Sequence, residues 1–502
     1  MAIWLVAFCP GLAAAATSNP RPNILFILCD DLGWSDSTLY GTTKLYETPN
    51  IEMLAKRGML FSQAYAHPMC SPTRSSIMTG LWPARTGVTE PCCHVEDVRL
   101  RPAPQSEGAP WMKAATPWGA TRLDTRYRTL AEALHEAGYV NGHFAKWHLG
   151  REPYDPLHRG FDVDIPHTYG PTQPGQYYAP WKWPTGVKYD SGNPGEYVDD
   201  RMADEAIRFM KAHRAEPFFC NFWMFSPHGD PQTTPELGTK YTKKIAGLPA
   251  DYPQRNPDTA GLHESLDRVV GRLVKALDEL NLTKNTIIVF NSDNGGWTGT
   301  SGRKDVAMTS NHPLRGGKTS LYEGGIRVPL IVVWPGHVKP GTRSDAVFSS
   351  VDFYPTLLDM VGLQPLSGQP LDGVDQLPAL LGKGRPRNAT FTFFPHYDRE
   401  LDSPGAAVRQ GDWKLIRRFF DNEDQTDCYE LFNLHTDPGE QRNLAVQRPE
   451  KVRELDDRLS HYLTESGAVL PVKNPKYDPA ARKPVVGSKV PGTADEISKD
   501  KY

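Results

Sequence analysis

The sequence predicts an α/β fold with one large domain and a smaller C-terminal α+β subdomain that carries an antiparallel sheet. Three continuous apolar runs, 23–29, 217–225 and 286–290, have the composition of strands that are buried on both faces of a sheet. Amphipathic segments with helical spacing separate them. After about Pro386 the pattern changes to short alternating runs, which are typical of antiparallel strands. The length of 502 residues suits two such units.

The first elements follow one another closely. Residues 48–58 begin with a capping threonine and a proline and end in glycine, which predicts a helix. Residues 59–66 predict a short strand that leads directly to Cys70. A further helix is expected to start just after Cys70, because Pro72 suits a first turn, and to end at Gly80.

The later elements continue the alternation of helices and strands. The predicted helices are 127–138, 199–213, 262–280, 352–362 and 448–465, and the predicted strands are 328–334, 390–394, 407–409, 413–416 and 429–432. The stretches 89–124 and 165–198 lack a regular period and are expected to be loops. The second is rich in aromatic residues, which either pack the loop or form a wall for sugar rings.

Composition and the start of the chain narrow the function classes. The formal charge of −3 is close to neutral, so nothing indicates a nucleic-acid partner. Residues 1–16 are apolar and end in an alanine run, which predicts a signal peptide over 1–18 and export to the periplasm or the cell exterior. The run lacks basic residues at its start, and a membrane anchor is the alternative, although the run is short for a span. We expect no membrane-spanning segment beyond it.

Cys70 is the first reactive residue to consider. The helix N-terminus expected beside it has free N–H groups and a favourable dipole, which would stabilise a thiolate or a bound oxyanion. Arg74 lies about one turn further along, and its guanidinium suits a tetrahedral oxyanion. The alternative is a simply buried cysteine, and the chemistry alone leaves the two interpretations equal.

Polar residues also follow three of the predicted buried strands. Asp30 and Asp31 follow the first, His228 follows the second, and Asp293 and Asn294 follow the third. Ligands of α/β sheets gather at the carboxyl ends of strands, so these oxygen donors predict a cage for Ca²⁺ or, less favourably, Mg²⁺. A solvated loop or helix cap is the alternative for the paired aspartates.

Three further basic residues could serve the same site. Lys146 and His148 lie two residues apart, so that on an extended chain they share a face. A surface lysine and a satisfied histidine are the alternative. Lys318 follows two glycines but lacks the leading glycine of a nucleotide-binding loop, whose place is taken by His312, and is interpreted as a loop cation.

The order of residues from Cys70 onward resembles the signature of the type I, formylglycine-dependent sulfatases. The fixed positions of that signature are matched by Cys70, Pro72, Arg74, Thr79 and Gly80. The motifs around the other candidate residues occur in the order of that family, along nearly the whole chain after the signal.

The resemblance implies an alkaline-phosphatase-like α/β fold, in which a large mixed sheet is flanked by helices. It also implies a catalytic domain over 19–386 and a C-terminal subdomain and tail over 387–502. The metal ligands that it implies are Asp30, Asp31, Cys70, Asp293 and Asn294. The catalytic residues that it implies are Cys70, Arg74, Lys146, His148, His228 and Lys318.

The same resemblance implies a mechanism. A maturation enzyme, the formylglycine-generating partner, oxidises Cys70 to formylglycine, whose hydrated diol attacks sulfur. Ca²⁺ and Arg74 stabilise the diol, and Lys146 and Lys318 bind the sulfate oxygens. His228, with Lys318 as a second candidate, protonates the leaving alcohol, and His148 takes the proton from the second hydroxyl so that sulfate leaves.

The substrate implied is a sulfated saccharide of the galactose or N-acetylgalactosamine type. The residues expected to line a sugar pocket are His167, His396, Tyr397 and Arg409. Two alternatives remain. One is a hydrolase of phosphodiesters or phosphonate monoesters on the same fold, and the other is a non-catalytic protein that binds sulfated glycans and keeps Cys70 as a thiol.

Overall fold

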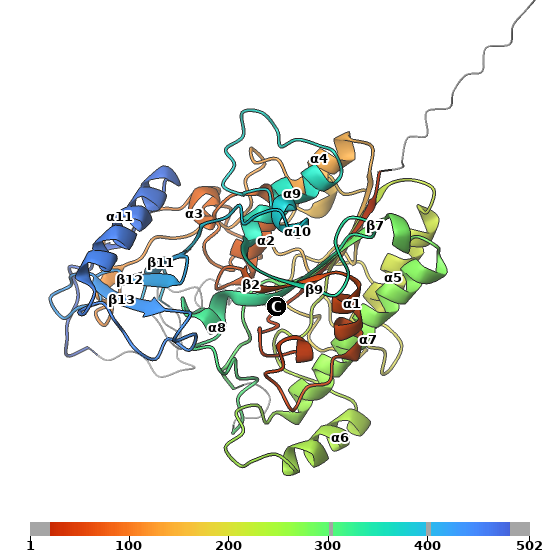
Figure 1. Ribbon diagram of the computed structural model, residues 1–502, viewed down its shortest axis with the longest axis horizontal. Coiled ribbons are helices and arrows are strands. Elements are labelled where there is room, and N and C mark those ends of the chain that lie inside the picture. Colours follow the sequence, from red (N-terminus) through yellow and green to blue (C-terminus); the bar gives the residue numbers. More distant parts are fainter. Residues whose placement is uncertain (1–20, 301–304, 398–402, 482–502) are drawn as a thin grey trace, which may run out of the picture.

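The computed structural model describes residues 21–300, 305–397 and 403–481, and an eight-stranded mixed sheet lies at its centre (Figure 1). The predicted signal peptide lies outside the described residues. The strands of the large sheet, in spatial order, are β5 (Val163–Ile165), β4 (Val140–Ala145), β6 (Phe218–Trp223), β1 (Asn23–Cys29), β7 (Thr286–Ser292), β8 (Arg327–Val333), β2 (Met59–Tyr65) and β9 (Thr342–Ser349).

Strand direction brings five chain segments to one edge of this sheet. Strands β5, β4, β6, β1 and β7 are parallel to one another. Strand β8 runs antiparallel to both β7 and β2, so that β2 again has the direction of β7. The carboxyl ends of β1, β2, β4, β6 and β7 therefore meet at the same edge, which is where ligands bind in such sheets.

Helices cover both faces of the large sheet (Figure 1). In β1 the odd-numbered apolar residues pack with α1, α5 and α7, whereas the even-numbered ones pack with α2, α4, α9 and α10. This alternation is the period of a strand that is buried on two sides. The helices are α1 (Pro49–Arg57), α2 (Cys70–Thr79), α3 (Pro83–Thr86), α4 (Leu130–Glu136), α5 (Val198–Ala212), α6 (Pro235–Ala246), α7 (Pro257–Glu279), α8 (Glu323–Ile326), α9 (Phe353–Met360), α10 (Leu377–Leu380) and α11 (Pro449–Glu465).

A second, antiparallel sheet follows the large one. Its strands are β10 (Ala389–Phe394), β11 (Gly405–Gln410), β12 (Trp413–Arg418) and β13 (Cys428–Asn433), paired in chain order. Helix α11 packs on this sheet through Leu455, Leu459 and Leu463. A short pair, β3 (Ala114–Ala115) with β14 (Val472–Lys473), ties the long loop to the end of the described chain. The predicted combination of a large mixed sheet and a separate antiparallel sheet is confirmed, while the exact domain boundary at 386 stays a prediction.

The structure also contains elements that the sequence pattern did not predict. The first half of strand β9 alternates between half-buried and exposed residues at the sheet edge, and α6 buries only Tyr241, so neither carries a strong apolar period. Strand β4 holds Asn141 and His143 in its buried interior. Helix α7 starts at Pro257 rather than at residue 262, because Asn256 caps it by accepting from the N–H groups of residues 258 and 259.

Candidate active site

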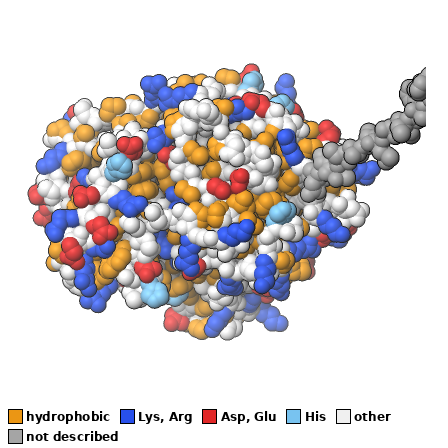
Figure 2. Space-filling view, turned by 45° about the horizontal axis from the view of Figure 1, so that its top comes forward, with side chains coloured by type: hydrophobic (Ala, Val, Ile, Leu, Met, Phe, Trp, Pro, Cys, Tyr) orange, Lys and Arg blue, Asp and Glu red, His pale blue; other side chains and the backbone are white. Residues whose placement is uncertain are grey.

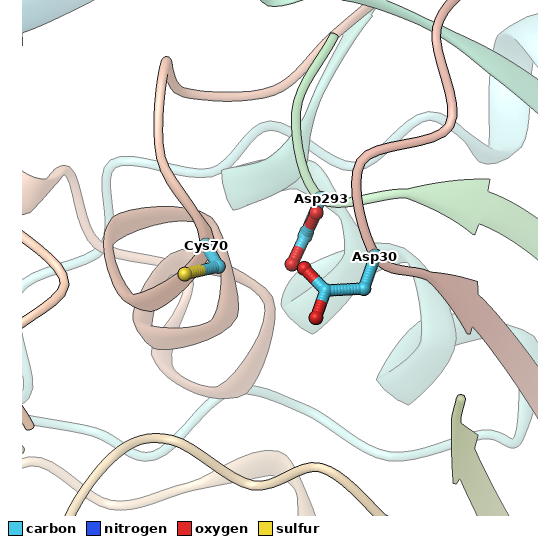
Figure 3. Close-up of side chains that lie close together, drawn as sticks. All are labelled: Asp30, Cys70 and Asp293. Carbon is cyan, nitrogen blue, oxygen red and sulfur yellow. The ribbon is translucent and has the colours of Figure 1, made fainter. Parts of the chain in front are cut away.

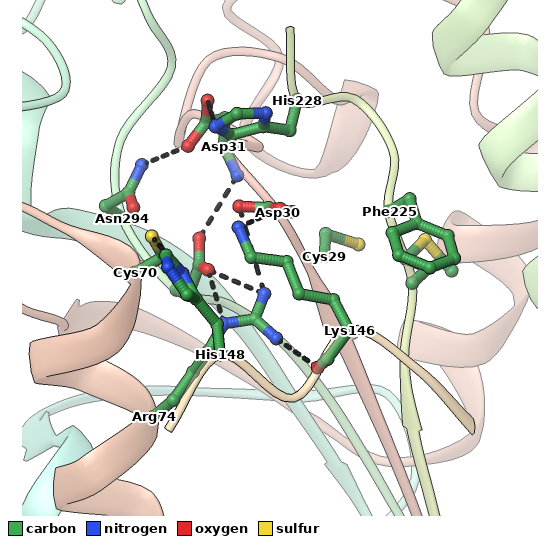
Figure 4. Close-up of polar contacts among 12 residues, drawn as sticks. Cys29, Asp30, Asp31, Cys70, Arg74, Lys146, His148, Phe225, His228 and Asn294 are labelled. Carbon is green, nitrogen blue, oxygen red and sulfur yellow. Dashed lines mark hydrogen bonds and ion pairs between the residues drawn. The ribbon is translucent and has the colours of Figure 1, made fainter. Parts of the chain in front are cut away.

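Side chains from the five converging segments meet in one buried cluster (Figure 4). Asp30 and Asp31 come from the end of β1, and Asp293 and Asn294 come from the end of β7. Cys70 opens α2, directly after β2. These predicted ligands are all nearly inaccessible to solvent, and the structure therefore brings together residues that lie far apart in the chain.

Three of these side chains lie close together (Figure 3). A carboxylate oxygen of Asp30, the Sγ of Cys70 and a carboxylate oxygen of Asp293 all lie within 4.8 Å of each other. Asp30, Asp31 and His228 form a second group within the same limit. The backbone N–H of Asp31 donates to Asp293 Oδ1 over 3.1 Å, which fixes the ends of β1 and β7 relative to one another.

Each carboxylate of the cluster has a close basic partner. Lys146 Nζ lies 2.5 Å from Asp30 Oδ2, and Lys318 Nζ lies 2.8 Å from Asp31 Oδ1. Arg74 Nη2 lies 2.7 Å from Asp293 Oδ2. Buried charges are stable only when they are paired in this way. The three pairs cancel, so the side chains alone leave this cluster without net charge.

The donor set fits a hard divalent cation. Within the described part of the chain, Asp30 Oδ1 and Asn294 Oδ1 are buried and find no hydrogen-bond partner. Unpaired buried oxygen atoms are costly unless something else compensates them. Carboxylate and amide oxygens are the ligands that Ca²⁺ and Mg²⁺ prefer, and a dication would add two positive charges to the balanced cluster. Asn294 is held for this purpose by a 2.7 Å hydrogen bond from Nδ2 to Asp31 Oδ1.

The carboxylates differ in how their surroundings affect ionisation. Burial raises the pKa of Asp31, but Lys318 and His228 outweigh it and hold the pKa well below its usual range. For Asp293, burial and the charge of Asp30 raise the pKa, although Arg74 opposes them. Asp31 is thus a fixed negative charge in the cluster.

Cys70 is the first residue of α2, whereas the helix was expected to start just after it, and Met69 is the N-cap residue. Burial raises the pKa of its thiol, and Lys146 and Lys318 only partly counter this effect. A reactive thiolate needs a lowered pKa. The interpretation of Cys70 as a stabilised thiolate is therefore wrong for the unmodified side chain, because desolvation outweighs the helix N-terminus.

His148 faces Cys70 directly. Its Nδ1 lies 3.3 Å from Cys70 Sγ, and burial, reinforced by the charge of Lys146, keeps its pKa well below the usual value. A neutral imidazole at this distance can act as a base. The backbone here is not extended as expected, since Ala145 and His148 have φ values of 75° and 56°. Such left-handed backbone is costly for these residue types and is concentrated at functional sites.

His228 and Lys318 both contact Asp31. His228 Nε2 lies 3.8 Å from Asp31 Oδ2, and Tyr177 Oη donates to the His228 carbonyl over 2.6 Å. Burial, followed by the charge of Lys318, lowers the pKa of His228. Burial disfavours the charged form of Lys318 as well, but Asp31 more than offsets it, so the net shift of the Lys318 pKa is upward.

The four residues predicted to line a sugar pocket lie in different surroundings. His167 is half exposed, pairs with Asp164 and lines a cavity of about 180 Å³ together with Arg151 and Tyr169. Gly150, two residues after His148 in the chain, is one of the residues that line this cavity.

The other three predicted sugar residues are engaged inside the protein. His396 Nε2 lies 2.8 Å from Thr89 Oγ1, and the Tyr397 hydroxyl accepts from the N–H of Ala114. Arg409 is only 6 % exposed and donates to Tyr65 Oη over 2.5 Å, which links the small sheet to β2. Its contacts are those of a bridge between the sheets and do not support a place in a sugar pocket.

The aromatic stretch 165–198 serves mainly as packing. Tyr177, Trp181 and Tyr197 are buried in the core on the α5 side of the large sheet. Tyr169 is the exception, because it lies in the cavity and stacks on Arg151 with 3.8 Å between the guanidinium carbon and the ring centre.

Sequence reasoning did not identify His94, whose Nδ1 lies 3.1 Å from His148 Nε2. His94 comes from the long loop 89–124, which has no regular period and no motif that marks it.

Sequence reasoning also did not identify the buried group of Glu323, Lys414 and Glu440, in which Lys414 Nζ lies 3.0 Å and 2.8 Å from the two carboxylates. The alternating sequence pattern of β12 predicts a strand that contains Lys414, but it does not indicate that this lysine pairs with two buried carboxylates.

The surface agrees with the near-neutral composition. Figure 2 shows acidic and basic side chains interspersed over one face of the molecule. Across the described ranges, none of the helices has both the length and the apolar character needed to span a bilayer.

Comparisons with known proteins agree with the geometry. The family model described as Sulfatase matches residues 22–363, and the model described as N-sulphoglucosamine sulphohydrolase, C-terminal, matches residues 317–468. The chain is 33% identical to an N-acetylgalactosamine-6-sulfatase of Canis lupus familiaris over 401 residues, which cover 75% of this chain and 69% of the relative. It is 30% identical to an N-acetylgalactosamine-6-O-sulfatase of Bacteroides thetaiotaomicron over 527 residues, with coverage of 89% and 94%. The solved structure of Ps i-CgsB in complex with k-i-k-neocarrahexaose superposes with a TM-score of 0.69 at 28% identity, covering 89% of this chain and 93% of that one.

Proposed function

Because the chain belongs to the sulfatase family and is a sulfuric ester hydrolase, we propose that it removes sulfate from a saccharide of the galactose or N-acetylgalactosamine type, using a nucleophile made from Cys70. The observation that carries this proposal is the single buried cluster in which Cys70, three carboxylates and three basic side chains meet. A glycan-binding protein would have no use for so many buried charges around one cysteine.

The nucleophile is the formylglycine derived from Cys70, and it depends on a maturation enzyme as partner. The raised pKa of the thiol supports this, since Cys70 in its unmodified form is protonated and a poor nucleophile. The Sγ atom in the structure stands where an oxygen of the hydrated aldehyde would lie. We also propose export of the protein, because such maturation and a saccharide substrate suit the predicted signal peptide.

We propose Ca²⁺ as the metal, held by Asp30, Asp31, Asp293, Asn294 and the modified Cys70. When bound, the cation supplies charge stabilisation for anionic oxygen atoms at the reacting centre. Since the side-chain charges already cancel, a dication leaves a surplus of two positive charges. That surplus suits an anionic sulfate ester together with an ionised nucleophile.

The basic side chains of the cluster have separate roles in sulfate binding, positioning and proton transfer. Lys146 and Lys318 are held by Asp30 and Asp31 and can turn their N–H groups to the sulfate oxygens, which stabilises the charge that develops in the transition state. Arg74 orients Asp293 and the first turn of α2. His228, assisted by Lys318, donates a proton to the leaving alcohol, because a bound anion favours the protonated imidazole. His148 accepts a proton from the nucleophile through Nδ1.

The cavity that Gly150 helps to line supports a saccharide substrate. It combines the aromatic ring of Tyr169 with the polar groups of Arg151, Asp164 and His167, as sugar-binding sites do. Two of the relatives are named for N-acetylgalactosamine 6-sulfate, which is the first substrate to examine.

The proposal is tested by measuring inorganic sulfate released from N-acetylgalactosamine 6-sulfate and galactose 6-sulfate, with protein produced together with a maturation enzyme. Cys70→Ala should abolish release, whereas the matched control Cys428→Ala, which changes a half-buried cysteine of β13, should retain it. An aryl phosphodiester serves as the competing substrate. Faster hydrolysis of the phosphodiester than of every sulfate ester would contradict the proposal.

A further inference from the structure

We propose that Arg315 is a positioning residue, which fixes the loop that carries Lys318 by binding to the C-terminal part of the chain at Glu440. The inference rests on the proposed function, in which Lys318 donates to the sulfate oxygens. It goes beyond that function because it gives the C-terminal part of the chain a role in sulfate recognition. The loop, residues 315–323, ends at the first residue of α8, which lies beside the small sheet (Figure 1).

The backbone of this loop contacts two segments that supply the reactive residues. The N–H of Lys318 donates to the Gly296 carbonyl over 3.1 Å, and the N–H of Thr319 donates to the Pro68 carbonyl over 2.9 Å. Gly296 lies just after β7, and Pro68 precedes Cys70 by two residues. The position of the loop therefore sets where the Lys318 side chain starts relative to both halves of the cluster.

The conformation of the loop depends on contacts from outside it. Thr319 is β-branched and has a φ value of 77°, in the left-handed region that such residues rarely adopt. Backbone of this kind persists only where the surroundings determine it, and it is concentrated at functional sites. Gly316 also has a positive φ value, 74°, so the chain turns directly after Arg315. Contacts at the two ends of the loop are therefore needed to hold Lys318 in place.

Glu440 contacts both ends of the loop. At the first end, Arg315 Nη1 donates to the Glu440 carbonyl over 3.0 Å, and at the other end the N–H of Glu323 donates to Glu440 Oε2 over 2.7 Å. The N–H of Gly324 donates to the Arg315 carbonyl over 2.8 Å, which joins the two ends to each other. Glu440 is itself fixed, because it is fully buried and pairs with Lys414 over 2.8 Å.

The side chain of Arg315 is held in the orientation that makes this contact. Its guanidinium carbon lies 3.8 Å from the ring centre of Tyr322, and Tyr322 Oη donates to Glu430 of β13 over 2.8 Å. The Arg315 guanidinium also lies 3.8 Å from Glu430, although such a pair near the surface contributes little by itself. Because the Arg315 side chain is 41 % exposed, it can be replaced without leaving a cavity in the core.

Release of the first end of the loop would affect catalysis through Lys318. Lys318 Nζ pairs with Asp31 over 2.8 Å, but this contact leaves the backbone of the loop free to move. A group that stabilises charge in the transition state must be placed accurately, and a displacement of about 1 Å can cost about 100-fold in rate. We therefore expect the Arg315 contact to matter for turnover more than for stability.

The test compares Arg315→Met, which keeps a long side chain but cannot donate, with Arg315→Lys, which can still donate to the Glu440 carbonyl. The first readout is kcat/KM for sulfate release from whichever of the two proposed monosaccharide sulfates the wild type hydrolyses faster. We expect Arg315→Met to lower kcat/KM by about 10- to 100-fold and Arg315→Lys to retain most of it.

The second readout is hydrogen exchange of peptides from the loop and from β7. In Arg315→Met the amides of Lys318 and Thr319 should exchange about 10-fold faster, as loss of one hydrogen bond permits, while the amides of β7 keep their wild-type rates. A residue that serves only global stability would change the exchange of both peptides.

The controls separate this inference from its premise. Arg385→Met, which breaks the exposed Arg385–Asp345 pair, should behave as wild type in both readouts. Arg315→Ala replaces Arg315→Met if that variant does not fold. A wild type that releases no sulfate from any ester would overturn the proposed function, whereas the exchange of the loop would still decide whether Arg315 holds it. With an active wild type, the inference is overturned by full kcat/KM in Arg315→Met, by an equal loss in Arg315→Lys, by unchanged exchange of the loop, or by faster exchange throughout β7.

Discussion

The guanidinium of Arg74 is completely buried, and its environment explains why the residue type matters at the scale of single residues. Nε and Nη2 both donate to Asp293 Oδ2, over 3.0 Å and 2.7 Å, and Nη1 donates to the Lys146 carbonyl over 2.7 Å. The planar fork thereby fixes three chain segments, which a lysine could not do. Other buried side chains near α2 determine how the free energy of unfolding depends on pH.

The first prediction concerns His67, which is buried ahead of α2 and contacts Ser76 Oγ through Nε2 over 3.0 Å. Burial lowers its pKa to about 3. The folded-state pKa lies below that of the unfolded chain, so the neutral ring stabilises the fold above pH 6.5 and this stability is lost as the pH falls. We expect a loss of about 2 kcal/mol in unfolding free energy between pH 7 and pH 5 from this residue.

His67→Gln retains a polar group at the position of Nε2 but does not titrate. Urea unfolding at both pH values should therefore show a smaller pH dependence for the variant than for wild type. Equal pH dependence in the two proteins would refute the assignment.

At the scale of elements, the small sheet supports the loop that carries Lys318. Lys414 of β12 lies between Glu323, the first residue of α8, and Glu440, and all three are buried. Glu440 Oε2 in turn accepts from the N–H of Glu323 over 2.7 Å. The group joins α8, which follows the Lys318 loop directly, to the second sheet.

The second prediction is that Lys414→Met lowers the unfolding free energy by about 3 to 5 kcal/mol, because it removes the cation that Glu323 and Glu440 share in a buried group. The matched control is Lys275→Met, which breaks the exposed Lys275–Glu279 pair and should cost no more than about 1 kcal/mol. Thermal or urea unfolding of both variants measures the difference. A Lys414→Met protein as stable as the control would show that the Glu323–Lys414–Glu440 group does not stabilise the fold.

At the scale of the whole molecule, the fold brings together short segments that are separated by most of the chain. Much of this could be predicted, because continuous apolar runs mark β1, β6 and β7, and chemistry-bearing residues follow these strands directly. The places of Asp30, Asp293 and His228 at one sheet edge follow from that pattern.

Other parts could not be predicted for physical reasons. Edge strand β9 and surface helix α6 bury too few apolar residues to show a period. His94 reaches His148 from a loop whose course depends on tertiary contacts alone. Nothing in the sequence around Arg409 indicates whether its side chain joins the two sheets or contacts a ligand.

The third prediction concerns metal binding. Ca²⁺ should raise the melting temperature of the protein relative to the same protein in a chelator, since a ligand that binds only the folded state stabilises it by about 2.7 kcal/mol at 100 times its Kd. Asn294→Ala should weaken this shift, and Asp278→Asn, which changes an exposed carboxylate, should leave it intact. Differential scanning calorimetry over a Ca²⁺ series measures both. A melting temperature that is independent of Ca²⁺ would contradict the proposed ligand set.

The most direct measurement is the mass of the tryptic peptide Gly58–Arg74, which contains Cys70, from protein made together with a competent maturation enzyme. The account predicts a peptide whose mass is lower by the difference between a CH₂SH and a CHO group, in proportion to the sulfatase activity of the preparation. An unmodified cysteine in a fully active preparation would contradict it, because a buried thiol with a raised pKa would then have to be the working nucleophile.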